Sequence, residues 1–211
     1  EKEREEEREG ERKLTASSSA GRDREKEEER EGKKELREDL IEKEEEELYG
    51  NWCGWHNDHC SLTGLCSARY ISERERERDE EGGEEIENPD SQAGLYVKAR
   101  DGSVVRVTIP SDHIAFQIGE TAQIHSGGCL QATPHAVRGV QVSGVSRETF
   151  AVFMEPMWHS PMRGPEGITV DQIQSETAIR SLPSCIPILT DRWRPDMNFG
   201  EFTAHTLHAY H

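Results

Sequence analysis

The uneven distribution of charge along the 211 residues is the feature that most constrains the fold. Residues 1–48 contain 21 acids and 13 bases, and residues 73–90 contain 10 acids and 3 bases. These two segments therefore hold −15 of the formal net charge of −17. Burying an unpaired ion costs several kcal/mol, so neither segment can enter a hydrophobic core. Only the other 145 residues can build one.

The remaining residues have an ordinary balance of 12 acids and 10 bases. A stretch of about 145 residues suffices for one core but not for two. We expect a low-complexity Glu/Arg/Lys-rich segment at residues 1–48, disordered or forming a solvated helix. A folded domain follows at residues 49–156, with residues 73–90 as an acidic surface loop. Residues 157–211 form a C-terminal extension that packs on this domain.

Short strands separated by turns are expected from Trp52 to Pro156. The Asp101-Gly102 pair lies between two β-rich runs and predicts a hairpin. Many short strands at spacings near ten residues are typical of a β-sandwich or jelly roll, so the fold class is mainly β. Near the C-terminus, apolar residues at helix-like spacing predict one helix between residues 198 and 210. The other expected strands are residues 61–66, 113–118, 132–137 and 149–154.

Charge, hydropathy and cysteine content exclude several classes of protein. An acidic balance argues against a nucleic-acid-binding surface, which needs basic patches. No stretch approaches the roughly 20 apolar residues of a membrane span. The charged N-terminus does not resemble a secretory signal. An odd number of irregularly spaced cysteines favours a reducing compartment, so we expect a cytoplasmic protein. The cysteines are Cys53, Cys60, Cys66, Cys129 and Cys185.

The stretch Trp55-His56-Asn57-Asp58-His59 is the most informative for chemistry. In an extended chain the side chains of residues i and i+2 point the same way, so His56 and Asp58 converge on one point. His135, on a later predicted strand, is the leading candidate for a third metal ligand. Two histidines and one carboxylate leave open coordination positions and suit non-haem Fe(II).

Arg147 and Thr149 follow His135 by about a dozen residues. Their spacing predicts that they share one face of a strand. A guanidinium offers a planar fork to a carboxylate, and a neighbouring hydroxyl adds a further donor. Together they would hold the far carboxylate of a small dicarboxylic acid.

The order and spacing of these residues resemble the C-terminal part of the isopenicillin N synthase-like branch of the Fe(II)/2-oxoglutarate-dependent oxygenases. Further matching segments are residues 61–63, 94–97, 114–120, 132–138 and 147–153. The resemblance implies a double-stranded β-helix (a jelly roll). That fold would be incomplete here, because a low-complexity segment precedes the matching region, so sheet edges and a core face would be exposed.

The resemblance also implies site residues and an activity. His56, Asp58 and His135 would bind Fe(II), while Arg147 and Thr149 would bind the co-substrate 2-oxoglutarate. The enzyme would be a dioxygenase that oxidises a small organic molecule with O2, coupled to decarboxylation of 2-oxoglutarate to succinate. Neither the substrate nor the oligomeric state follows from the sequence.

Two other interpretations remain open. The chain could be a non-catalytic, truncated jelly-roll remnant whose charged segments mediate its interactions. Alternatively, the dense cluster of Cys53, His56, His59 and Cys60 could bind zinc. Structural zinc sites, however, usually combine two pairs of ligands that lie some distance apart in the sequence. Cys66 and Cys129 do not form a second such pair.

Overall fold

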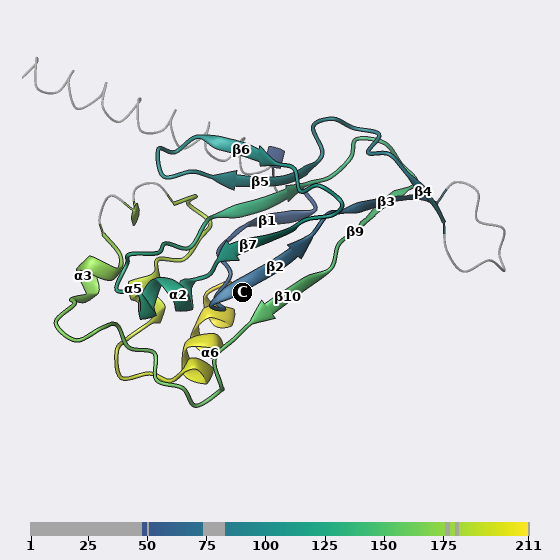
Figure 1. Cartoon of the computed structure of the whole chain (residues 1–211). Coiled ribbons are helices and arrows are strands. Elements are labelled where there is room, and N and C mark those ends of the chain that lie inside the picture. The colour runs from purple at the N-terminus through teal and green to yellow at the C-terminus, as the bar shows by residue number, and fades with distance from the viewer. Residues whose placement is uncertain (1–47, 50, 74–82, 176–177, 180–181, 211) are drawn as a thin grey trace, which may run out of the picture. The chain divides into compact units, whose positions relative to one another are not determined.

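Ten short strands in the described part of the chain form three antiparallel sheets (Figure 1). The computed structural model describes residues 48–49, 51–73, 83–175, 178–179 and 182–210. The prediction for residues 1–48 therefore lies almost wholly outside the described residues. The strands are β1 (Cys53–His56), β2 (Leu62–Cys66), β3 (Arg69–Ser72), β4 (Glu84–Ile86), β5 (Gly94–Lys98), β6 (Val104–Val107), β7 (Ile114–Ile118), β8 (His135–Arg138), β9 (Val145–Glu148) and β10 (Ala151–Met154).

Two of the sheets have the alternating connectivity of a jelly roll. One sheet has the strand order β1-β8-β5-β6 and another has the order β10-β2-β7. The chain passes from one to the other between β1 and β2, between β6 and β7, and between β7 and β8. Side chains of the two sheets meet, since Gln117 on β7 contacts His135 on β8. The predicted mainly β jelly roll is confirmed. Among the described residues, the first of these sheets has four strands and the second has three.

The predicted hairpin at Asp101-Gly102 joins β5 to β6. Residues Leu95 to Lys98 pair antiparallel with Val107 to Val104. The side chain of Asp101 accepts hydrogen bonds from the backbone and hydroxyl of Ser103. Gly102 has a φ of 83°, a conformation that glycine adopts without steric cost. This hairpin is confirmed.

The acidic insert at residues 73–90 is not entirely a loop, in contrast to the prediction from its charge. Strand β4 lies within it and pairs antiparallel with β3, while residues 74–82 lie outside the described residues. In the sheet of order β4-β3-β9, β4 is an edge strand, so its glutamates face solvent. Arg69 Nη2 lies 2.6 Å from Glu85 Oε2 across this pair. An exposed edge strand can therefore carry the charge that a core strand cannot.

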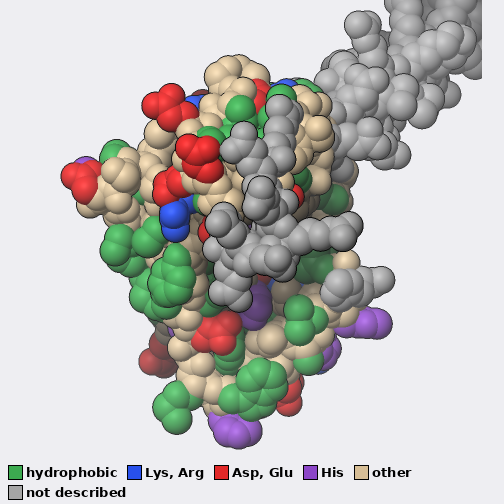
Figure 2. All heavy atoms as spheres, turned by 90° about the vertical axis from the view of Figure 1, so that its right-hand side faces the viewer, with side chains coloured by type: hydrophobic (Ala, Val, Ile, Leu, Met, Phe, Trp, Pro, Cys, Tyr) green, Lys and Arg blue, Asp and Glu red, His purple; other side chains and the backbone are tan. Residues whose placement is uncertain are grey.

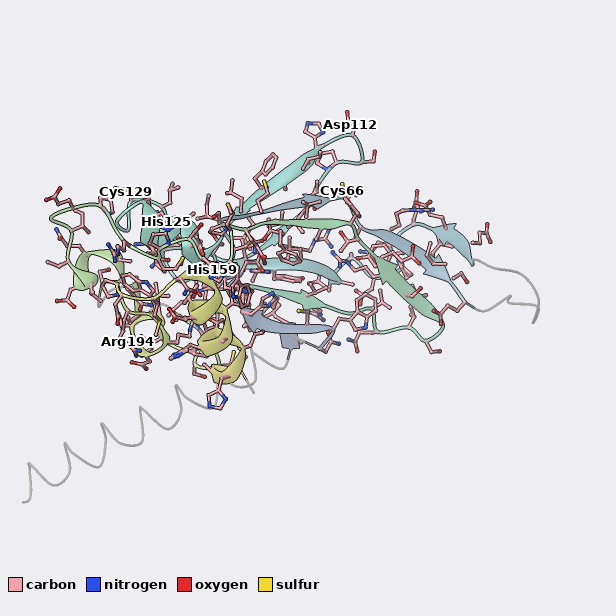
Figure 3. The ribbon with its side chains drawn as sticks, turned by 90° about the horizontal axis from the view of Figure 1, so that it is seen from below. Cys66, Asp112, His125, Cys129, His159 and Arg194 are labelled. Atoms are coloured by element: carbon pink, nitrogen blue, oxygen red, sulfur yellow. The ribbon has the colours of Figure 1, made fainter. Side chains whose placement is uncertain are left out.

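The predicted strand 149–154 and the residues before it are split between two sheets. Strand β9 ends at Glu148 and pairs with β3, whereas β10 begins at Ala151 and pairs with β2. The segment that pairs with β9 and β10 is interrupted at the corresponding position. There β2 ends at Cys66 (labelled in Figure 3) and β3 begins at Arg69. Two paired strands thus bend together. The prediction that Arg147 and Thr149 share one strand is therefore wrong.

Short helices and the C-terminal extension build the larger core cluster. The helices are α2 (Glu120–His125), α3 (Val170–Ile173), α5 (Leu189–Arg192) and α6 (Phe199–Ala209). The predicted C-terminal helix is confirmed as α6, whose Asn198 and Glu201 cap each other reciprocally. Among the described residues, no helix has both the length and the apolar character to cross a membrane. The buried cluster contains Ile124, Met162, Ile173, Leu189, Trp193, Phe199 and Phe202.

One face of the sheet β10-β2-β7 carries exposed apolar side chains. Phe116 is 65% exposed, and its neighbours across the sheet on this face are Gly64 and Val152. Ile114 and Met154 lie on the same face and are also exposed. Figure 2 shows hydrophobic side chains gathered along one side of the molecule. Within the described residues, this face has the character of an uncovered core surface.

Two phenylalanines test where the core lies. Phe202 is fully buried and Phe116 is 65% exposed. We expect Phe202→Ala to lower the free energy of unfolding by about 3–5 kcal/mol, because it removes a fully packed ring. Phe116→Ala is expected to change it by less than about 0.5 kcal/mol. Urea unfolding monitored by circular dichroism measures both, and equal losses would contradict this assignment of the core.

Candidate metal centre

His56, Asp58 and His135 meet at one point in the structure. One ligand atom from each lies within 4.8 Å of the others. His56 ends β1 and His135 begins β8, and these two residues are direct partners in the antiparallel pair. Their ring centroids are consequently 4.1 Å apart. Asp58 follows two residues after His56, as the extended-chain argument predicts, and its Oδ1 lies 3.8 Å from His56 Nε2.

Hydrogen bonds at Nδ1 of both imidazoles direct their Nε2 atoms at Asp58, and His135 Nε2 also lies 2.9 Å from Gln117 Nε2. His56 Nδ1 lies 2.8 Å from the Gly54 carbonyl oxygen, and His135 Nδ1 lies 3.0 Å from the Thr133 carbonyl oxygen. A carbonyl can only accept, so Nδ1 carries the proton in both rings. The unprotonated Nε2 atoms then face Asp58 Oδ1, at 3.8 Å and 3.7 Å. Metal-ligating histidines commonly donate the N–H of their other ring nitrogen to a carbonyl in this way.

The two oxygens of the buried Asp58 carboxylate have different surroundings. Oδ2 accepts hydrogen bonds from Thr63 Oγ1 at 2.5 Å and from Gln117 Nε2 at 3.2 Å. Oδ1 faces the two imidazoles. One oxygen is thus anchored by β2 and β7 while the other is directed at the space between the histidines.

The electrostatics of the site keep His135 neutral. Burial, and secondarily the nearby His56, lower the pKa of His135 to about 4. At His56, burial lowers the pKa, but the hydrogen bonds to Cys53 and to the Gly54 carbonyl, together with the nearby charges of Cys53 and Asp58, raise it overall. The Cys53 thiol lies 3.8 Å from His56 Nδ1, and this hydrogen bond lowers the pKa of Cys53. A neutral imidazole at His135 is ready to donate its lone pair to a cation.

The turn that follows Asp58 is held by the start of α2. The amide of Glu120 donates to the Asp58 carbonyl at 2.8 Å, and the amide of Thr121 donates to the Cys60 carbonyl at 3.2 Å. Gly119 allows this close approach, because a Cβ there would lie 2.1 Å from the Cys60 carbonyl oxygen. The backbone around the predicted ligands is thus fixed by an element far along the sequence.

Arg147 lies on β9 and reaches the interior near the candidate site. Its Nε is buried and has no hydrogen-bond partner among the described residues. Its positive charge contributes to lowering the pKa of Cys53, which itself contacts His56. A cavity of ≈ 400 Å³ opens beside it. The cavity is lined by Trp52, Cys53, Val137, Val145, Ser146 and Arg147.

Thr149 is placed differently from what its spacing suggests. It follows β9 at the bend and is exposed. Its hydroxyl donates to the Cys66 carbonyl oxygen at 3.2 Å. The structure therefore does not bring Thr149 and Arg147 onto one strand face.

Thr63, Gln117 and Cys53 also belong to this site, although the sequence did not single them out for a role in it. Thr63 and Gln117 both point inward, at equivalent positions on neighbouring strands. The available signal was their polarity within apolar strands, since a buried polar side chain needs a partner.

The alternative zinc site is not formed. Within the described residues, His56, Asp58 and His135 are the single group of three or more potential ligand residues that comes together. Cys60 instead contacts Leu62 and Thr63, and none of the five cysteines is in a disulfide. Cys53, His56, His59 and Cys60 therefore do not act as a zinc knuckle in this fold.

Comparison with known proteins finds similarity to solved structures alone. No protein-family model matches the chain, and neither does any curated protein. A full-length Neurospora crassa protein, solved in complex with alpha-KG, is 19% identical with a TM-score of 0.45. The match covers 75% of this chain and 37% of that one.

Two further solved structures are similar to this chain. The dioxygenase for auxin oxidation in rice is 17% identical with a TM-score of 0.44, and the match covers 73% of this chain and 39% of that one. A putative 2OG-Fe(II) oxygenase family protein from Caulobacter crescentus is 18% identical with a TM-score of 0.41, covering 74% and 39%. The chain thus spans less than two-fifths of the length of each. The ligand geometry, rather than these similarities, is the basis of what is proposed below.

Gly119 provides a test of the backbone support under the site. Gly119→Ala places a methyl group against the Cys60 and Asp58 carbonyl oxygens. We expect the turn to be displaced and the free energy of unfolding to fall by about 1–3 kcal/mol, in the range of overpacked interior positions. Gly54→Ala is the matched control, because a Cβ there meets no atom within 4 Å. Equal unfolding midpoints in urea for the two variants would contradict the assigned contact.

The low pKa of His135 predicts a pH dependence of stability. Between pH 6.5 and about 4, the unfolded chain binds a proton at this position that the folded protein does not. The free energy of unfolding of the metal-free protein should therefore fall as the pH drops through this range, by up to about 3 kcal/mol from this group. His135→Gln should show a shallower decline in urea unfolding at pH 7, 6, 5 and 4. A decline of equal slope in both proteins would show that His135 is not held neutral.

Proposed function

We propose that His56, Asp58 and His135 bind Fe(II), and that the chain carries the iron site of an oxygenase dependent on 2-oxoglutarate. The observation that carries this proposal is the convergence of one ligand atom from each of His56, Asp58 and His135 within 4.8 Å of one another. The protein would oxidise a small organic molecule with O2. It would couple that oxidation to the decarboxylation of 2-oxoglutarate to succinate.

The donor set fits a divalent iron ion. Two neutral imidazoles and one carboxylate on one face of the ion leave further positions open, as in the non-haem Fe(II) oxygenases. Bound there, iron would supply the activation of O2. The chain's own residues orient the ligands: the Gly54 and Thr133 carbonyls fix the two imidazole tautomers. Thr63 and Gln117 hold the carboxylate from its other oxygen.

Arg147 fits the far carboxylate of 2-oxoglutarate. Its buried Nε lacks a partner within the described part of the chain, and a guanidinium pairs with carboxylates through two parallel hydrogen bonds. The cavity beside it has no acidic residue in its lining, so no fixed charge would repel a dicarboxylate. Because the Thr149 hydroxyl is engaged elsewhere, Arg147 would carry this interaction without it.

The proposal extends to compartment and partners. None of the five cysteines is in a disulfide, which supports a reducing compartment such as the cytoplasm. The partners would be a small-molecule substrate and O2, with no nucleic acid and no membrane involved. The division of the chain at residues 48 and 156, with an extension that packs on the domain, is part of the same proposal.

Metal titration and succinate formation test the proposed function. We expect one Mn(II) or Fe(II) per chain, and loss of this binding in Asp58→Ala and His135→Ala. His113→Ala is the matched control, because His113 is 64% exposed and does not belong to the ligand group. Succinate should form from 2-oxoglutarate in the presence of Fe(II) and O2. Arg147→Gln should raise the KM for 2-oxoglutarate about 10- to 100-fold, the cost of losing hydrogen bonds between charged groups.

The same measurements separate the oxygenase from the non-catalytic alternative. A chain that binds no divalent metal and forms no succinate would be the truncated remnant. A chain that binds metal and turns over, with Arg147→Gln unchanged in its KM for 2-oxoglutarate, would retain the iron site but not the proposed co-substrate site.

A further inference from the structure

A buried ion pair lies behind the candidate metal centre. Glu120, at the start of α2, and Arg192, at the end of α5, are each 2% exposed. The contact is bidentate: Arg192 Nη1 donates to Glu120 Oε2 at 2.6 Å, and Nη2 donates to Oε1. Removing two charges from water is costly, and apolar residues of similar volume are often as stable. A pair of this kind therefore contributes orientation more than stability.

The remaining hydrogen bonds of Arg192 lock the guanidinium in place. Its Nη1 also donates to Thr206 Oγ1 at 2.9 Å, and its Nε and Nη2 donate to the Pro187 carbonyl oxygen at 3.3 and 3.2 Å. Its Cζ lies 5.7 Å from the centre of the Phe202 ring. These contacts hold the Arg192 guanidinium in one orientation. The guanidinium in turn fixes the plane of the Glu120 carboxylate.

Glu120 in turn holds the residue between two proposed metal ligands. Glu120 Oε1 accepts a hydrogen bond from Asn57 Nδ2 at 3.1 Å, and Asn57 is 7% exposed. A carboxylate can only accept, so this bond fixes which way the Asn57 amide points. The Asn57 backbone amide donates to Tyr210 Oη at 3.3 Å, and the Glu120 amide donates to the Asp58 carbonyl. The segment from Asn57 to Asp58 is thereby held through its side chain and its backbone.

We propose that the Glu120–Arg192 ion pair is a further positioning device of the metal centre, acting on the Asn57–Asp58 segment beside the direct contacts of Thr63 and Gln117 with Asp58. This inference rests on the proposed function and names the residues that set its ligand geometry. The pair transmits the placement of α5 and α6 to Asn57, and so sets the angle at which Asp58 Oδ1 faces His56 and His135. The C-terminal part of the chain acts on metal binding without contacting the metal.

The test replaces the pair without leaving a lone buried charge. The double variant Glu120→Leu, Arg192→Met keeps the side-chain volume but loses the anchor for Asn57. We expect its unfolding midpoint in urea, measured without metal, to stay close to that of the unaltered chain. Its dissociation constant for Co(II), read from the d–d absorption bands, should rise at least tenfold with altered band positions, as when residues that orient metal ligands are lost.

Two further variants complete the design. Asn57→Ala keeps the ion pair and removes the link, so it should weaken Co(II) binding in the same direction and serves if the double variant does not fold. Arg194→Gln is the matched control (Figure 3). Arg194 is 61% exposed and faces Asp196 at 3.8 Å on the surface of the same segment, so its loss should leave Co(II) affinity unchanged.

Amide hydrogen exchange adds a readout that does not need the metal. In the metal-free chain, the amides of Asn57 and Glu120 should be protected, and both should exchange faster in the double variant. Equal Co(II) affinity and spectra in the unaltered chain and in folded variants would overturn this inference while leaving the proposed function intact. If the unaltered chain binds no Co(II) at all, the proposed function fails, and the positioning role fails with it.

Discussion

The buried carboxylate of Asp58 is the constraint around which the two jelly-roll sheets are arranged. A carboxylate in the interior is tolerated only when its oxygens have partners. Thr63 and Gln117 supply hydrogen bonds from the sheet β10-β2-β7, while His56 and His135 face it from the sheet β1-β8-β5-β6. One side chain thus takes partners from both layers.

Local geometry explains which parts of the site could be read from the sequence. The convergence of His56 and Asp58 depends on the two-residue period of an extended chain. The hairpin at Asp101-Gly102 depends on a turn that glycine permits. His135 is inferred from its place on a later predicted strand, whereas the pairing of that strand with β1 is found only in the structure. The first two inferences use properties that a few neighbouring residues determine.

The parts that could not be predicted depend on contacts between distant segments. The bend after Glu148 arises because β2 and β3 bend at the same level, which the sequence around Arg147 and Thr149 does not encode. The burial of Arg192 against Glu120 brings together residues 72 positions apart. Charged residues are usually solvated, so nothing in their local sequence marks this pair as interior.

The bend between β9 and β10 has a mechanical consequence for the proposed co-substrate. It places Arg147 on the sheet β4-β3-β9, whereas His56 and His135 belong to the sheet β1-β8-β5-β6. A dicarboxylate held at both of its ends would span two separately bonded layers and act as a non-covalent crosslink between them. The stability of the contact between the two sheets would then increase with the fraction of the protein that has co-substrate bound, since a ligand stabilises the state that binds it.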